Sequence, residues 1–371
     1  MRFSRKHMYL LGGGAMTLLV LFLVALPFFL GERDEGGDTK PPVLENGEEV
    51  IIPETGLFRS DDGGAAWRAK NTGEEELDFA KQELFDLKID PQNSLVLYAG
   101  TKGAGLWKSF DRGDTWQKPH DAAQVLEAEA DVYRIAIDPR DANKVYIAVF
   151  QQNRGRVLKS ENAAGFFTEV YASPLERFGV FDVFVDRQGQ VFIATGAGEF
   201  LKSIDGGKSW RVVRRFADGL VRLFIDPLNS SSLYVVSAKG KIFSSYDAGK
   251  TWQDLEPTFK SFAGSAKNRK LFLDTRGALY TTSDFGLLRS QNGGRKWEAV
   301  PLIIPSSVGA LWFTPHPVNT DIFYATALSN IYKTSDGGES WQTLRSPSVN
   351  RATFFLLDQQ NPEVMYAFVS E

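Results

Sequence analysis

Five charged residues stand at corresponding positions in five successive segments of the chain, each four residues before a predicted turn. They are Asp86, Arg134, Asp182, Arg222 and Lys270. If the segments surround a common axis, these side chains converge there, and opposite charges that converge either bind a polar ligand or neutralise one another. Glycoside hydrolysis would instead need two carboxyl groups about 5 to 9.5 Å apart. Asp86 and Asp182 are the acids available for it, but their segments are not neighbours.

This sequence contains few of the residues that other kinds of catalytic site require. The chain has three histidines, His7, His120 and His316, and no cysteine. The lack of cysteine excludes disulfides, a thiol nucleophile and thiolate metal sites, and the scattered histidines supply neither a metal site nor a serine triad. We therefore predict no cofactor and no metal. A net charge of −4 also gives no basic footprint for nucleic acid.

Two acidic segments are a second group of candidate binding residues. Residues 71–84 carry Glu74, Glu75 and Glu76, and residues 118–131 are also rich in acids. Loops on a rigid scaffold are where binding residues concentrate. The alternative is that both segments are solvated connections between structural units.

The elements that hold these residues follow from an eight-residue motif that occurs seven times. It has a hydroxyl residue first, an acid or amide third, a glycine fifth and a tryptophan last. The acid or amide and the tryptophan of the six well-preserved copies are Asp62 and Trp67, Asp111 and Trp116, Asp205 and Trp210, Asp247 and Trp252, Asn292 and Trp297, and Asp336 and Trp341. A degenerate copy runs from Ser160 to Phe167. The copies begin 49, 51, 43, 42, 45 and 44 residues apart, a spacing typical of propeller blades.

Each copy is predicted to be the turn of a β-hairpin. An Asp or Asn side chain accepts hydrogen bonds from backbone N–H groups one to three residues ahead, and glycine adopts positive φ where the chain reverses. We expect the tryptophan to pack back across its own hairpin. Because a short apolar strand precedes each copy, the hairpins supply the two outer strands of each blade.

The two inner strands are predicted upstream of each hairpin, as apolar runs joined by turns such as Asp90-Pro91, Asp226-Pro227 and Thr314-Pro315. The chain starts its first hairpin at Gly56 without inner strands and ends after the inner strands near residues 364–368 without a hairpin. We therefore predict an all-β fold: a seven-bladed β-propeller of four-stranded antiparallel blades, closed by pairing the N- and C-terminal strands. The inner turns and the hairpin motifs share one face, and we expect ligands on the opposite face.

The motif resembles the Asp-box, or BNR, repeat. The run from Lys202 to Trp210 is most similar to the repeats of the sortilin N-terminal propeller and the photosystem II stability and assembly factor propellers. Sialidases and xyloglucanase-type glycoside hydrolases carry the repeat as well. The resemblance covers residues 56–371 and implies the propeller fold and a structural role for the motif. It supplies no catalytic residue, because the Phe-Arg-Ile-Pro motif of sialidases is absent and xyloglucanase-type enzymes hold their substrate between two propellers.

The N-terminal residues predict a membrane segment. Residues 8–30 are uncharged and mostly apolar and follow Arg2, Arg5 and Lys6, and such a stretch is long enough to span a bilayer. Positive charge before it places the N-terminus in the cytoplasm. We predict a cytoplasmic tail at 1–7, a signal-anchor at 8–30, a flexible acidic linker at 31–55 and the propeller at 56–371. A cleaved signal peptide is the alternative, although no Ala-x-Ala site follows the stretch.

Taken together, the sequence predicts a single-pass membrane protein whose propeller lies on the extracytoplasmic side, in the periplasm or at the cell surface. We expect the propeller to be a binding or assembly module for a protein or a membrane complex rather than an enzyme. The alternative is a sialidase- or xyloglucanase-like glycoside hydrolase with a carbohydrate ligand. A purely structural surface protein is the third possibility.

Overall fold

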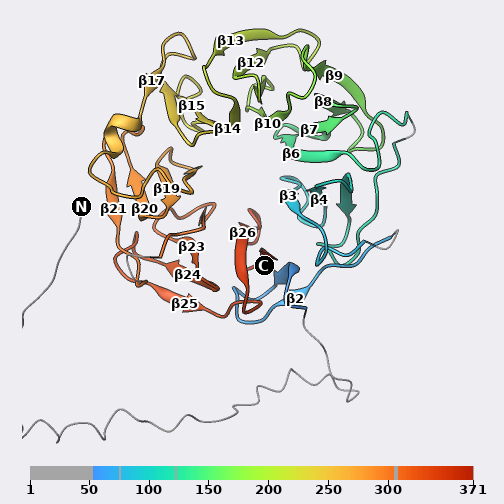
Figure 1. Ribbon diagram of the computed structural model, residues 1–371. Helices are drawn as coiled ribbons and strands as arrows, with labels where there is room; N and C mark the ends of the chain where they lie inside the picture. Colours follow the sequence, from blue (N-terminus) through green and yellow to red (C-terminus); the bar gives the residue numbers. More distant parts are fainter. Residues whose placement is uncertain (1–52, 75–76, 122, 305–307, 371) are drawn as a thin grey trace, which may run out of the picture. The chain divides into compact units, whose positions relative to one another are not determined.

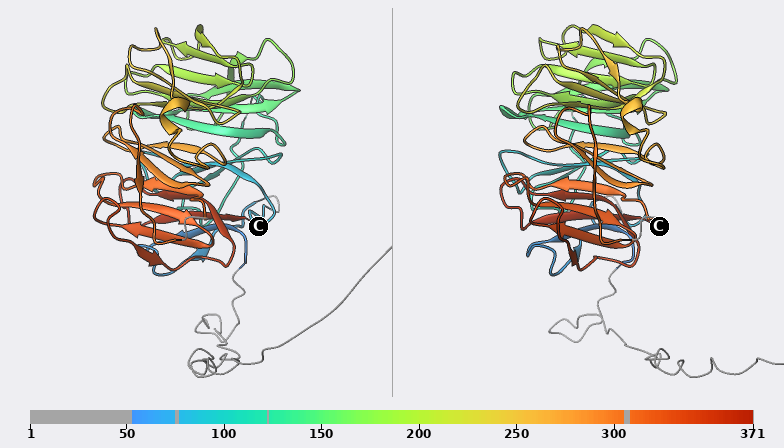
Figure 2. Two further views of the ribbon diagram at one scale, coloured as in Figure 1. Left: turned by 60° about the vertical axis from the view of Figure 1, so that its left-hand side comes forward. Right: turned by 90° about the vertical axis from the view of Figure 1, so that its left-hand side faces the viewer.

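The computed structural model describes residues 53–74, 77–121, 123–304 and 308–370. These ranges contain 27 β-strands and one short 3-10 helix, η1 (Glu256–Phe259), and the strands form seven antiparallel sheets. The sheets surround a central opening as the blades of a propeller (Figure 1), and they are seen on edge in Figure 2. The predicted all-β, seven-bladed architecture is confirmed.

Each blade is numbered here in chain order, and its strands are given from the centre outward. The first three blades are β3 (Leu84–Ile89), β4 (Leu97–Thr101) and β5 (Leu106–Ser109); β6 (Asp131–Asp138), β7 (Asp141–Gln151), β8 (Arg154–Ser160) and β9 (Thr168–Ala172); and β10 (Val180–Val185), β11 (Val191–Thr195), β12 (Glu199–Ser203) and β13 (Arg211–Arg215). The fourth and fifth are β14 (Leu220–Ile225), β15 (Leu233–Ser237), β16 (Ile242–Ser245) and β17 (Gln253–Asp254); and β18 (Lys270–Leu273), β19 (Leu279–Ser283), β20 (Gly286–Ser290) and β21 (Glu298–Val300). The last two are β22 (Trp312–Pro315), β23 (Phe323–Ala327), β24 (Asn330–Thr334) and β25 (Gln342–Leu344); and β26 (Arg351–Leu357), β27 (Met365–Ser370), β1 (Gly56–Ser60) and β2 (Arg68–Ala69).

The second strand of each blade carries much of the core. Every residue of β4, β11, β15, β19 and β23 is buried, because each strand packs against a neighbouring blade on both faces. Such strands read as continuous apolar runs rather than as alternating patterns. The outermost strands, by contrast, are short and largely exposed.

The ring closes as predicted. Strand β1 pairs with β27 from Gly56 opposite Val369 to Ser60 opposite Met365. Figure 1 shows the blue start of the propeller beside its red end. The two chain ends thus build one blade, which leaves no open inner sheet edge at the junction.

The first blade departs from the prediction of four strands. Its fourth strand is reduced to a single bridge between Lys108 and Gln117, because Pro119 follows closely and has no N–H group to continue the ladder. The connection before this blade packs over the gap: Leu77 and Phe79 are buried, and the rings of Phe79 and Trp116 lie edge to face at 5.2 Å.

No helix in the ranges that the structure describes has the length and apolar character needed to cross a bilayer. The predicted cytoplasmic tail, the signal-anchor at 8–30 and most of the predicted linker lie outside the described residues. The compact unit runs from Ile52 to Glu371.

Candidate functional site

The hairpin motifs are hydrogen-bonded turns between the third and fourth strands. In the copy at Ser203, the hydroxyl group donates to Asp205 Oδ1 at 2.8 Å and accepts the Gly207 amide at 2.8 Å, and Asp205 Oδ1 accepts the Ser209 amide at 2.9 Å. The same three contacts recur in the other six copies, including the degenerate one at Ser160. The acid thus reaches four residues ahead, farther than predicted, and the hydroxyl closes the tight turn.

The rings of Trp116, Trp252 and Trp297 lie against the glycine of their own motif, as predicted, but most indole N–H groups donate outside their own turn. Only the Trp252 indole N–H donates within its own turn, to the Gly249 carbonyl. The indole of Trp210 donates to the Val170 carbonyl of the preceding blade at 2.7 Å. Four further indoles also reach the preceding blade or its outgoing connection; they belong to Trp67, Trp116, Trp297 and Trp341. The motif tryptophans therefore fasten neighbouring blades together.

Basic residues just before the motifs make a second set of bonds between blades. Lys108 Nζ donates to the Ala163 carbonyl at 2.7 Å, and Arg59 Nη1 donates to the Arg112 carbonyl at 2.8 Å. Both carbonyl groups belong to the fourth residue of the next motif. The side-chain donors of Lys108 and Arg59 are thus engaged in contacts between blades, which supports a structural role for the motifs.

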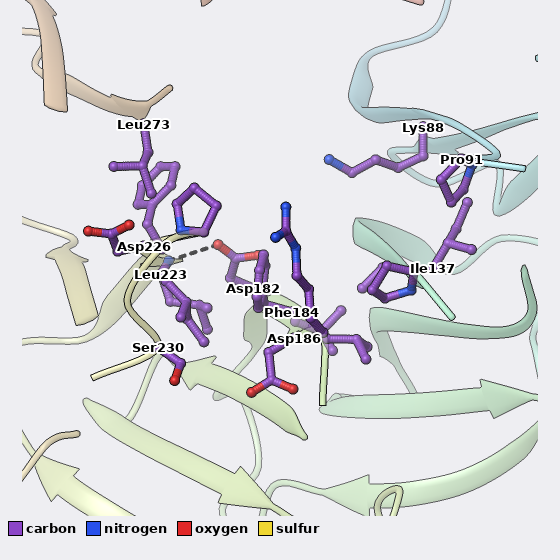
Figure 3. Close-up of a pocket in the computed structure, with 18 of the residues that line it drawn as sticks. Lys88, Pro91, Ile137, Asp182, Phe184, Asp186, Leu223, Asp226, Ser230 and Leu273 are labelled. Atoms are coloured by element: carbon purple, nitrogen blue, oxygen red, sulfur yellow. Dashed lines mark hydrogen bonds between the residues drawn. The ribbon is translucent and has the colours of Figure 1, made fainter. Parts of the chain in front are cut away.

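The central channel brings together three of the five predicted charged residues in a buried ion triad. Arg134 Nη1 lies 2.7 Å from Asp86 Oδ1, and Arg134 Nε lies 3.0 Å from Asp182 Oδ1. The second oxygen of each carboxylate accepts an amide from the following blade: Ile135 donates to Asp86 at 2.9 Å, and Leu223 donates to Asp182 at 2.8 Å (Figure 3). The triad therefore ties four blades together at the axis.

Burial and charge act in opposite directions within the triad. Burial disfavours the charged guanidinium of Arg134, but the carboxylates of Asp86 and Asp182 outweigh it and raise the Arg134 pKa. Burial also raises the pKa of Asp182, against the effects of Arg134 and the Leu223 amide. One guanidinium is shared between two carboxylates, and Asp182 has the longer contact with it.

The ring of equivalent positions continues with two further cations and then with aromatic residues. Arg222 Nε lies 3.8 Å from Asp182 Oδ2, whereas the Lys270 ammonium lies 4.8 Å from the centre of the Trp312 ring. The rings of Trp312 and Phe354 are 4.9 Å apart. Sequence reasoning identified the charged part of this ring but missed Trp312 and Phe354. These two residues occupy equivalent positions in their blades, but they carry no charge that would mark them as candidate site residues.

Lys270 has no acidic partner within the described ranges. The residue is exposed, but the surrounding protein still desolvates the ammonium group and lowers the Lys270 pKa. The structure thus brings Asp86, Arg134, Asp182 and Arg222 into contact and leaves Lys270 on an aromatic surface.

A cavity of about 680 Å³ occupies the channel on one side of the triad. Arg134, Asp182 and Arg222 line its inner end, and the inner turns, including Pro139 and Pro227, line its mouth. The cavity therefore opens on the face that also bears the hairpin motifs. The sequence predicts ligands on the opposite face, and the inner turns are not among the predicted site residues.

Aspartates of the inner turns cap their own backbone. Asp226 Oδ1 accepts the amides of Leu228 and Asn229 at 2.9 and 3.3 Å. In the turn predicted at Thr314-Pro315, the acceptor is His316, whose Nδ1 accepts two amides at 3.2 and 3.1 Å. A histidine thus replaces the aspartate of the other blades. In the described part of the chain, no three His, Asp or Glu residues are grouped so that they could hold a metal ion.

The acidic connections lie against the outer edges of the first two blades. Glu74 is exposed and its amide donates to the Trp116 carbonyl at 2.8 Å, whereas Glu75 and Glu76 lie outside the described residues. In the second connection, Asp121 Oδ2 accepts the amides of Val125 and Leu126 at 2.7 and 2.8 Å. These segments are packed and hydrogen-bonded, and they do not join the channel residues.

Comparisons with known proteins define the fold. No family model and no curated protein matches the chain. The GH74 xyloglucanase from Xanthomonas campestris is 16% identical, with a TM-score of 0.61, and the match covers 84% of this chain but 52% of the enzyme. YCF48 bound to D1 peptide is 15% identical, with a TM-score of 0.59 and coverage of 78% and 93%. YCF48 from Cyanidioschyzon merolae is 12% identical, with a TM-score of 0.58 and coverage of 78% and 96%.

These similarities are to proteins with unlike roles, at low identity. The chain spans about half the length of the xyloglucanase it matches. The likeness therefore shows a seven-bladed β-propeller fold, and it assigns no activity to this chain.

Proposed function

We propose that this protein is a membrane-tethered, extracytoplasmic binding module whose propeller holds a polypeptide segment of a partner protein or membrane complex. The observation that carries the proposal is the buried triad. Asp86 and Asp182 are the acids that glycoside hydrolysis would use here, and both are engaged by Arg134 and by an amide of the next blade. Their side chains are 0% and 5% exposed, whereas a catalytic acid or nucleophile must reach its substrate. This arrangement favours binding over hydrolysis.

Two further observations support a polypeptide as the ligand. The cavity of about 680 Å³ falls within the range of sites that bury a small ligand or a few residues of a chain. YCF48, which shares the fold, has a solved structure in which it is bound to D1 peptide. The Asp-box resemblance to assembly-factor propellers agrees with the same proposal.

Photo-crosslinking in native membranes tests this function. Leu228 lines the cavity and is 68% exposed, so a photoreactive residue there is expected to crosslink to a discrete polypeptide. The matched control is Arg214, which is exposed on β13 at the outer rim. Equal labelling from both positions, or none from Leu228, would contradict a specific site in the cavity.

Hydrolysis is tested separately with the purified full-length chain and a panel of aryl glycosides and polysaccharides. We expect no turnover above the background of a heat-denatured sample. Robust hydrolysis that disappears in Asp86→Asn or Asp182→Asn would overturn the proposed function in favour of a glycoside hydrolase.

The membrane tether rests on the apolar stretch at 8–30 and the basic residues before it. We expect the full-length chain to remain in the membrane fraction after alkaline extraction, and a chain lacking residues 1–30 to be released. Protease added from the extracytoplasmic side should reach the segment before Gly56. Release of the full-length chain by alkali would remove the tether from the proposal.

A further inference from the structure

We propose that the central cavity binds an oxyanion, namely the carboxylate of a ligand with an apolar body, at its inner end between Lys88 and Arg222. The inference deepens the proposed function and rests on it in placing the ligand in this cavity. The two cations flank the triad: Lys88 Nζ lies 3.7 Å from Asp86 Oδ1, and Arg222 Nε lies 3.8 Å from Asp182 Oδ2.

The first argument is the balance of charge at the inner end of the cavity. Three cations, Lys88, Arg134 and Arg222, face the two carboxylates of Asp86 and Asp182. Arg134 makes short contacts with both acids, and the second oxygen of each acid accepts a hydrogen bond from a backbone amide. The outer two cations are therefore only partly neutralised, and such charge in a concave site attracts an anion.

The acids at the cavity mouth do not cancel this charge. Asp186, Asp226 and Asp274 use one oxygen each to accept amides of their own turns. In Figure 3 the carboxylates of Asp186 and Asp226 point away from the interior of the cavity, whereas the Lys88 side chain extends toward it. The interior thus presents cations, and its negative groups are directed into the turns.

The second argument is the unused hydrogen-bonding capacity of the two cations. Neither the Lys88 ammonium nor the Arg222 guanidinium makes a hydrogen bond to any residue that the structure describes, and their contacts with the triad are longer than hydrogen bonds. Arg222 is held over the Phe224 ring, 5.5 Å from its centre. A guanidinium held in place by an aromatic ring presents a planar fork of donors, which matches a carboxylate or phosphate group.

The third argument is the apolar lining beside these donors. Phe184, Leu223, Phe224 and Leu273 line the same cavity. Cavities of this kind fix a ligand by a few placed polar groups and gain affinity from apolar contact. The site therefore fits a carboxylate attached to an aliphatic or aromatic group.

Isothermal titration of the full-length chain with 4-phenylbutyrate tests the inference, with the neutral 4-phenylbutyramide as the matched probe. We expect saturable binding of the carboxylate and affinity at least tenfold lower for the amide, because the charge-assisted bonds to Arg222 and Lys88 are lost. Raising the salt concentration should weaken binding of the carboxylate but not of the amide.

Variants of the chain locate the site. Arg222→Gln and Lys88→Gln should each weaken 4-phenylbutyrate binding about tenfold or more, and Arg222→Lys should retain part of the affinity because it keeps the charge but not the fork. Arg214→Gln, on the outer rim, is the control and should bind as the unaltered chain does. A melting curve for each variant verifies the fold. Equal binding of the two probes, or unchanged binding by both cavity variants, would overturn the inference.

A peptide probe distinguishes the source of the carboxylate. We would titrate a short apolar peptide with a free C-terminal carboxylate, the same peptide with an amidated C-terminus, and an amidated version that carries an internal glutamate. Binding of any carboxylate probe that depends on Arg222 supports the inference, and the strongest probe identifies the source. If neither 4-phenylbutyrate nor a carboxylate-bearing peptide binds, the inference fails.

Failure of the inference and failure of the proposed function give different results. Crosslinking of a polypeptide at Leu228 that is unchanged in Arg222→Gln and Lys88→Gln would retain the binding module and remove the oxyanion site. Binding of 4-phenylbutyrate without any polypeptide crosslink would retain the oxyanion site and remove the polypeptide partner.

Discussion

Replacing Arg134 with methionine should destabilise the propeller more than any other single substitution in the channel. The side chain is 7% exposed and holds the carboxylates of Asp86 and Asp182 at 2.7 and 3.0 Å. Methionine has a similar length but removes the two short ionic contacts, so that each carboxylate keeps one backbone amide and one more distant cation, Lys88 or Arg222. Removing one partner of a buried ion pair costs about 3 to 5 kcal/mol. For a unit of about 320 residues, an unfolding entropy of about 0.7 kcal/mol/K converts this into a fall in Tm of about 4 to 7 °C.

Calorimetry between pH 7 and pH 5 tests both the size and the cause of this effect. Burial already raises the pKa of Asp182, and Arg134 opposes that shift; in Arg134→Met the opposition is lost, so the folded state should take up a proton as pH falls and the deficit should shrink. The triple variant with Asp86→Asn, Arg134→Met and Asp182→Asn removes the buried charge and should recover part of the lost stability. An Arg134→Met protein that melts within 1 °C of the unaltered chain at pH 7, or a deficit independent of pH, would refute the reasoning.

Three further predictions concern the scaffold. Deleting residues 351–371 removes β26 and β27 and exposes the edge of β1, so we expect loss of soluble protein; a truncated chain that melts normally would disprove closure. Ser203→Ala leaves the buried Gly207 amide without its acceptor and should cost about 1–3 kcal/mol in urea unfolding, whereas Ser203→Thr, the residue present at Thr334, should be tolerated. Hydrogen bonds from the hydroxyl and amide of the residue four ahead lower the Asp247 pKa to about 2, from 3.8. Its stabilising contribution is therefore complete above about pH 4 and lost as pH falls toward 2, and Asp247→Asn should flatten acid unfolding in that range.

Much of the fold is predictable from the sequence because the spacing between successive motifs corresponds to the length of one blade. The hydroxyl and the acid of each motif serve the same turn in every copy, so even the degenerate copy at Ser160 keeps its three contacts. Closure follows from the incomplete halves at Gly56 and near Val364, which complete one blade. The turn contacts depend on local chain geometry, which can be predicted from the residue types in the turn.

The parts that could not be predicted depend on partners that residue types do not identify. Trp210 donates to a backbone carbonyl of the preceding blade, and every residue carries such a carbonyl group. Charges at Asp86, Arg134 and Asp182 indicated convergence, but the sharing of one guanidinium depends on side-chain reach and on the bulge between Leu84 and Asp86. The side of the triad on which the channel widens has no signature in the sequence.

The differences between equivalent positions argue for where specificity resides. If the channel-facing residues served only stability, we would expect every blade to carry the same stabilising arrangement of side chains at the axis. Instead, the ring passes from the triad at Asp86, Arg134 and Asp182 to the lone cation Lys270 and then to Trp312. The triad pairs its one guanidinium with two carboxylates and fixes the blades on its side of the axis. The cations beside it lack close counterions, which stability alone would not favour, and a ligand that supplies the missing negative charge gives them a use.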